Sequence, residues 1–140
     1  MASYAALALT AYGKYQQGQA AKQAGAWNQS VHNMEGASAE QQGLNQETIE
    51  RRQGREFLGR QATAIGQAGI GYGGSSAAVA HDSSINTELD ALNARYRGAF
   101  TKWGLTTQGT ALNYEGQVQA QSANLGAGAS ILRGFADYTS

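Results

Sequence analysis

Few residues of this sequence have the types and spacing that catalysis or metal binding requires. His32 and His81 are isolated, and the chain has no cysteine, so neither a thiolate site nor a paired-histidine metal site is indicated. Asp82 is followed by two serines, but with no partnered histidine beyond His81 these residues are better explained by local turn or capping chemistry. We therefore expect no enzymatic activity, no metal and no cofactor.

The segment from Gly69 to Gly74 matches the G-x-G-x-x-G pattern of dinucleotide-binding sites, and Glu88 and Asp90 follow at a distance that would suit a ribose contact. That fingerprint requires a buried β-strand before it, whereas residues 51–67 are polar and have a helical period. We interpret the glycines as a turn.

The densest charge cluster contains four arginines: Arg51, Arg52, Arg55 and Arg60. Glutamates three and four residues away favour ion pairing within one helix. The alternative is contact with double-stranded DNA that passes through a channel, without sequence specificity. The chain has ten basic and ten acidic residues, so no overall field draws it to nucleic acid.

Glycines mark one side of the first half of the chain. At 100° per residue, five of them fall within about 20° of one line along a helix: Gly18, Gly25, Gly36, Gly43 and Gly54. A flexible glycine-rich linker, the alternative interpretation, has no reason to keep this register. The pattern predicts a helix that another helix approaches closely, and Gly98, Gly109 and Gly116 predict the same for the second half.

The second half also carries an amphipathic stripe of large apolar side chains. Ile85, Leu89, Leu92, Tyr96, Phe100 and Trp103 recur every three or four residues, and Tyr114, Val118 and Leu125 return to the same line. We expect Leu89, Leu92, Tyr96 and Trp103 to pack either within the fold or between subunits.

These elements predict an all-α protein with a single helical domain over residues 1–140. One arm spans about 2–66, a Gly/Ser-rich turn about 69–76 and a second arm about 77–138, so that the chain forms an elongated antiparallel hairpin. Large core residues are scarce, so neighbouring copies would have to supply contacts, and we expect hairpins to assemble into a ring or tube. The two ends of the chain would meet and offer a membrane or a partner these apolar residues: Tyr4, Leu7, Leu9, Leu125, Ile131, Leu132 and Phe135.

Two sequence segments resemble the small internal virion proteins of T7-like podophages and their relatives. Residues 53–62 read QGREFLGRQA, and after the glycine/serine turn residues 88–96 read ELDALNARY. The resemblance covers roughly residues 50–98. It implies a protein stored inside the capsid near the portal and released into the host cell envelope ahead of the genome.

The same resemblance implies partners and a function. The chain would form a homo-oligomer and would bind other ejection or core proteins and the portal. The assembly would be part of the conduit for genome delivery, at the host outer membrane. The alternative is a static core or connector ring at the portal, with no membrane role.

Overall fold

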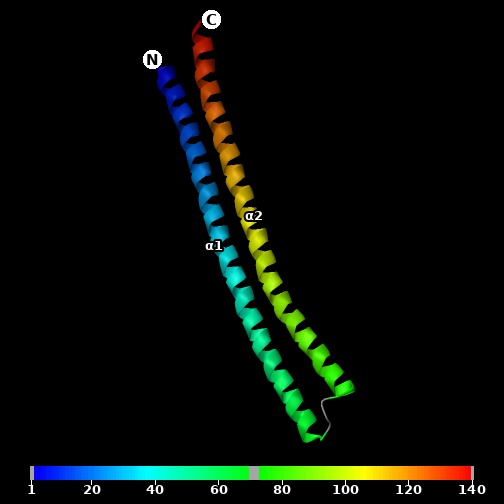
Figure 1. Cartoon of the computed structure of the whole chain (residues 1–140). Helices are drawn as coiled ribbons and strands as arrows, with labels where there is room; N and C mark the ends of the chain where they lie inside the picture. Colours follow the sequence, from blue (N-terminus) through cyan, green and yellow to red (C-terminus); the bar gives the residue numbers. More distant parts are fainter. Residues whose placement is uncertain (1, 70–72, 140) are drawn as a thin grey trace. The chain divides into compact units, whose positions relative to one another are not determined.

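The structure, a computed structural model, describes the backbone of residues 2–69 and 73–139 and the side chains of residues 8–69 and 73–132. Helix α1 spans Ala2–Gln67 and helix α2 spans Ser75–Thr139 (Figure 1). The two helices pack against each other, and the described residues include no strand. The predicted all-α helical hairpin is confirmed.

Both helices are long because the sequence offers no proline and many strong helix formers. Helix α1 stops at a glycine in the left-handed region, Gly69 with φ +66°, while the Ala68 amide still donates to the Ala64 carbonyl at 3.0 Å. Helix α2 starts after a second such glycine, Gly74 with φ +63°. The left-handed conformation is one that glycine adopts without a steric penalty, so both helix ends depend on these two residues.

The helix bounds lie close to the expected arms. Helix α1 ends one residue after the expected position 66, and α2 begins two residues before the expected position 77. The Ser76 hydroxyl donates to the Gly73 carbonyl at 3.0 Å, so it contributes to the start of α2. Residues 70–72 of the predicted turn lie outside the described part of the chain.

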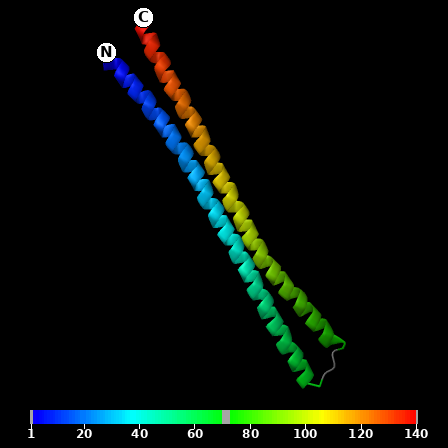
Figure 2. The ribbon, with the colours of Figure 1, turned by 60° about the vertical axis from the view of Figure 1, so that its left-hand side comes forward.

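The contacts of the chain group into two units. Unit 1 contains residues 1–34 and 105–140, and unit 2 contains residues 35–104. Within each unit a stretch of α1 lies beside a stretch of α2 (Figures 1 and 2). In unit 1, Gly18 lies at Ala120 whereas Gly25 lies at Asn113, so the helices run antiparallel. Unit 2 shows the same direction, with Gly36 at Lys102 and Gly54 at Thr87.

The residues buried between the helices are small. In α1 they are Ala11, Gly18, Gly25, Gly36, Gly43 and Gly54, and in α2 they are Ala91, Ala94, Gly98, Gly109, Gly116 and Ala120. No large side chain among the described residues is fully buried. The closest contact between the helices therefore consists of backbone and methyl groups, and the larger apolar side chains that face the other helix are only half-buried beside it: Leu58, Ile65, Leu105 and Leu112.

Candidate functional site

The glycines of unit 1 lie in the contact between α1 and α2. A methyl group added at Gly25 would lie 3.0 Å from the Leu112 carbonyl oxygen, and one added at Gly116 would lie 2.7 Å from the Ala21 carbonyl oxygen. Both distances are shorter than an ordinary van der Waals contact, so only glycine allows the backbones to come this close. Gln29 and Asn113 join the helices beside these glycines through a 2.6 Å hydrogen bond from Asn113 Nδ2 to Gln29 Oε1.

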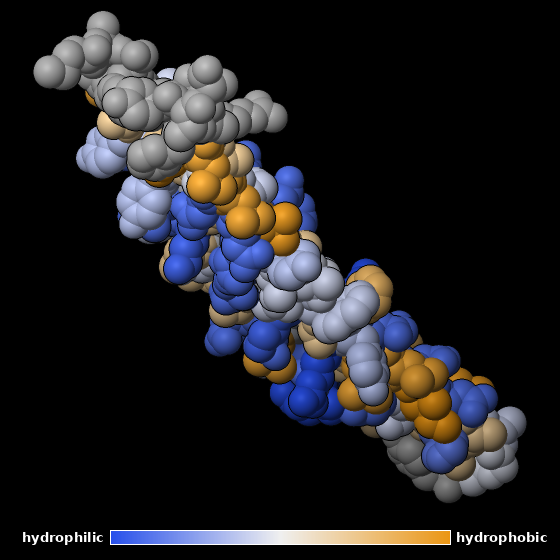
Figure 3. All heavy atoms as spheres, turned by 90° about the horizontal axis from the view of Figure 1, so that it is seen from above, coloured by the Kyte–Doolittle hydropathy of each residue, from blue (hydrophilic) through white to orange (hydrophobic). Residues whose placement is uncertain are grey.

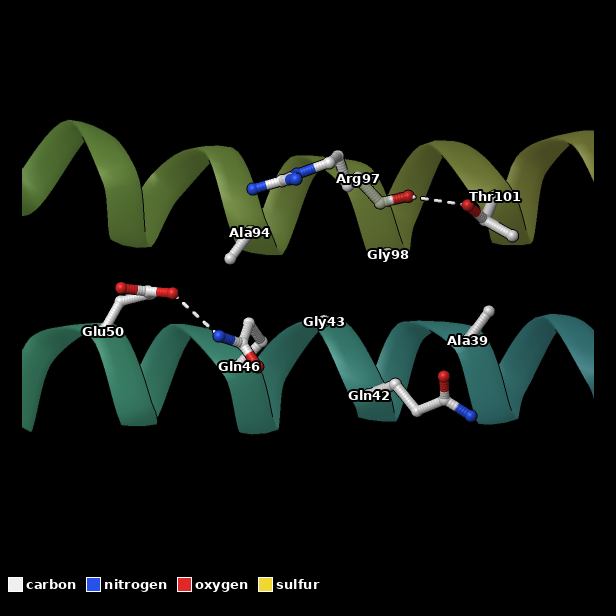
Figure 4. Close-up of a pocket in the computed structure, with 9 residues that line it drawn as sticks. All are labelled: Ala39, Gln42, Gly43, Gln46, Glu50, Ala94, Arg97, Gly98 and Thr101. Atoms are coloured by element: carbon white, nitrogen blue, oxygen red, sulfur yellow. Dashed lines mark hydrogen bonds between the residues drawn. The ribbon is translucent and has the colours of Figure 1, made fainter.

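The closest approach in unit 2 lies between Gly43 and Gly98, which face each other across the two helices (Figure 4). A methyl group on Gly43 would lie 2.8 Å from the Gly98 Cα atom. Ala39 and Ala94 flank this crossing (Figure 4), and together the four residues line a shallow groove with polar side chains along its rim. Further along α1, a methyl group on Gly54 would overlap the Thr87 side chain.

Ion pairs link the helices of unit 2. Lys102 Nζ lies 2.6 Å from Glu40 Oε2, and Arg51 Nη1 lies 2.6 Å from Glu88 Oε2. Arg51 also reaches Glu47 on its own helix at 3.0 Å. Hydrogen bonds to Glu47 and Glu88 raise the pKa of the Arg51 guanidinium above its ordinary value. Arg51 therefore acts as a cross-link between helices, and it is the one residue of the arginine cluster that confirms the predicted pairing with glutamate.

The other three arginines of the cluster are exposed and form no hydrogen bond or ion pair with a described residue. Arg52 lies on the side of α1 that faces away from α2, and at 100° per residue Arg55 and Arg60 lie roughly 140° apart around the helix. Arg55 and Arg60 thus lie on either side of Arg52, and the exposed Glu56 lies between Arg52 and Arg60, so this face carries an acidic group as well as basic ones. Contact with DNA in a channel stays a prediction.

The large apolar stripe of α2 lies on the side opposite the glycines. Relative to Tyr96, the residues Ile85, Leu89 and Trp103 fall within about 20° around the helix, whereas Gly98 falls about 160° away. Accordingly Leu89 is 51% exposed, Tyr96 70% and Trp103 63%, and Leu92 is half-buried. This stripe does not form the contact between the two helices, and packing between subunits is the alternative that stays a prediction.

In unit 1 the outward side of α2 is also apolar. It carries Tyr114, Val118, Leu125 and Leu132, all exposed, and Figure 3 shows apolar groups exposed among polar ones on one face of the molecule. Leu9 and Ile131 near the chain ends are exposed as well. Tyr4, Leu7 and Phe135, which we also expected at the apolar end, lie outside the described side chains.

The outward side of α1 in unit 2 has a different character. The positions facing away from α2 are polar and exposed: Gln41, Asn45, Thr48, Arg52 and Glu56. The hairpin of unit 2 thus has one polar outer side, on α1, and one apolar outer side, on α2.

The remaining candidates for chemistry stay apart in the structure. His32 is half-buried beside Gly109, and His81 is exposed, 4.0 Å from the Asp82 carboxylate. Within the described residues no three His, Cys, Asp or Glu side chains come together as metal ligands would. The segment before Gly69 is helix α1, which is not the strand that a dinucleotide site requires.

Sequence reasoning overlooked the alanines that complete the contact between the helices, above all Ala91 and Ala94. Their signal was available, since they fall within about 60° of Gly98 around α2 and carry the smallest side chain after glycine. The partners of Arg51 and Lys102 on the opposite helix were also overlooked, because they depend on the register between helices.

Comparison with protein-family models, with curated proteins and with solved structures finds no match to this chain. No helix in the described part of the chain contains a segment long and apolar enough to cross a membrane.

Proposed function

We propose that this chain is a self-assembling structural subunit of a phage genome-ejection apparatus, in which copies join through the outward apolar side of α2 to build part of the conduit across the host envelope. The observation that carries the self-assembly is the division of α2 into two opposite sides. Glycine and alanine face α1, and Leu89, Tyr96 and Trp103 face outward. The phage context comes from the resemblance at residues 53–62 and 88–96.

The energetics favour association over an isolated hairpin. Glycine and alanine bury little apolar area, so the contact between α1 and α2 gains chiefly from close backbone packing. Full burial of an exposed leucine or phenylalanine side chain yields about 1.5–3 kcal/mol, of which a partly exposed outward residue gains a part, whereas association costs roughly 4–15 kcal/mol. An outward side with several such residues can therefore offset the cost of bringing copies together.

The proposal places the protein in the virion near the portal and then in the host envelope, with other ejection proteins as partners. Neither the neutral net charge nor a small group of arginines with Glu56 among them favours tight DNA binding. Weak binding suits a conduit, because DNA that moves through it must not be held.

Two measurements on the purified full-length chain test this function. Mass photometry and electron microscopy should show oligomers of defined size, and dye-filled liposomes of outer-membrane lipids should leak when the protein is added. Oligomers without leakage would favour the static ring at the portal instead. A chain that stays monomeric up to high micromolar concentration, with and without liposomes, would contradict self-assembly.

A further inference from the structure

The outward side of α2 in unit 2 carries opposite charges along one edge. Glu88 and Arg95 lie seven residues apart, and both fall roughly 80–100° to the same side of the Leu89–Tyr96–Trp103 line. These apolar residues form a heptad pattern, and the line along which a second helix would pack on them is called the seam. Glu88 and Arg95 occupy the same flanking position beside the seam in two successive heptads. Any helix that packs on this side meets an acidic and then a basic group along the same edge.

We infer that this side binds the same side of a second copy of the chain, with the two α2 helices antiparallel and related by a two-fold axis near residues 90–91. In an antiparallel pair each edge faces the same edge of the other helix. Glu88 of one copy then meets Arg95 of the second copy, and Arg95 meets Glu88 in return. This inference rests on the self-assembly in the proposed function and names one contact of it, because a two-fold contact joins two copies and a larger assembly needs a second contact as well.

The apolar residues fit the register that the charges define. With Glu88 opposite Arg95 of the second copy, Leu89 lies opposite Leu92, and Ile85 lies opposite Tyr96. Val79 then faces Phe100, and both are exposed in the single hairpin, at 53% and 72%. The two central layers are thus filled by large side chains on both sides, with Leu89 against Leu92 and the aliphatic Ile85 against the aromatic Tyr96.

Other arrangements of two copies fit less well. An antiparallel pair shifted by one heptad would place Arg95 against Arg95 of the second copy, which is repulsive. A parallel pair in register would place Glu88 beside Asn93 and Arg95 beside Phe100, so neither charge would find an opposite one. A lipid surface is disfavoured because the edges of the stripe carry Glu88, Asp90, Arg95 and Arg97.

Both charged groups are available for this contact. Arg95 is exposed and forms no hydrogen bond or ion pair with a described residue. Glu88 accepts a hydrogen bond from Arg51 at one carboxylate oxygen, Oε2, which leaves Oε1 for a second donor. The second copy's Arg95 would thus complete a chain of charges from Arg51 through Glu88.

Charge reversal tests the pairing. Arg95→Glu should raise the dimer dissociation constant about tenfold or more, measured by analytical ultracentrifugation, because two attractive contacts become repulsive. Arg52→Glu makes the same charge change on the polar side of α1 and should leave the constant unchanged. Mixing Arg95→Glu with Glu88→Arg should restore dimers as mixed pairs, and circular dichroism checks that each variant keeps its helices.

Cysteine pairs test the register without altering charge, since the chain has no cysteine of its own. Under mild oxidation, a mixture of Leu89→Cys and Leu92→Cys chains should form the mixed disulfide faster than either chain alone forms its own. Faster formation of the Leu89→Cys homodimer would show a parallel pair and overturn the inference. Oligomers that tolerate Arg95→Glu and give no mixed disulfide would also overturn it while leaving the proposed function intact. A wild-type chain that never associates would refute both.

Discussion

Gly43 and Gly59 both lie in the interior of α1 in unit 2, but only Gly43 faces the backbone of α2. A methyl group on Gly43 would lie 2.8 Å from the Gly98 Cα atom, whereas one on Gly59 would have no atom of another element within 4 Å. Replacing either glycine by alanine gives the same intrinsic gain in helix stability, roughly 0.5–1 kcal/mol. The pair therefore isolates the effect of packing.

Gly59→Ala should raise the free energy of unfolding by that intrinsic gain. At Gly43 the gain is opposed by overpacking, which typically costs about 1–3 kcal/mol when the neighbour cannot move aside. The neighbour here is backbone, so it yields only if the helices separate. We expect Gly43→Ala to be less stable than Gly59→Ala by about 1–3 kcal/mol, or roughly 3–10 °C in Tm.

Thermal unfolding followed by circular dichroism measures both variants against the wild type at one low protein concentration, so that association contributes equally. Gly104→Ala on α2 is a second control, because a methyl group there also meets nothing within 4 Å. If Gly43→Ala stabilises the chain as much as Gly59→Ala does, the backbones of α1 and α2 are not in close contact at this crossing.

Three further predictions concern charge, DNA and lipid. Arg51→Ala should lower the Tm at low salt and have little effect at high salt; because the pKa of Arg51 is raised, its contribution is complete at neutral pH and disappears only in strong alkali. DNA binding should be weak. Changing Arg52, Arg55 and Arg60 to glutamine should make the slope of log binding constant against log salt concentration shallower by about one for each arginine that binds a phosphate. Leu125→Ser with Leu132→Ser should reduce liposome leakage and leave the helix content unchanged, and undiminished leakage would exclude this part of α2 from lipid contact.

The position of the glycines on one side of α1 could be predicted from the sequence because they are spaced by alternating steps of seven and eleven residues. A step of seven residues falls about 20° short of two helical turns, and a step of eleven exceeds three turns by about 20°, so alternating steps keep the glycines on one side. The spacing does not determine which helix packs against that side. Another copy of α1 would satisfy the pattern of Gly18, Gly25 and Gly36 as well as α2 does.

The position of the large apolar stripe could be predicted, but its environment could not. Apolar residues at helical spacing usually mark the side of a helix that faces the core. Helix α2 has two candidate sides, one with Leu89, Tyr96 and Trp103 and one with Gly98 and Gly109. The structure assigns the hairpin contact to the second, because glycines on both helices allow a close approach that the larger side chains would prevent.

The ion pairs between helices depend on which residues of α1 lie opposite which residues of α2. The sequence pattern of one helix alone does not determine this alignment. Once Gly43 meets Gly98, the antiparallel direction brings Glu40 to Lys102 and Arg51 to Glu88. Each charge on its own is typical of a solvated surface residue. The pairing becomes predictable only after the closest crossing is known.

The two opposite sides of α2 make folding and assembly separable by mutation. Changes on the glycine–alanine side, as at Gly98, alter the distance between α1 and α2 and should shift the Tm at any protein concentration. Changes on the outward side, as at Tyr96, remove interactions that a single hairpin does not make, so they should alter only the part of stability that grows with concentration. A Tyr96→Ser variant that unfolded at low concentration would therefore show that this side chain serves the hairpin itself.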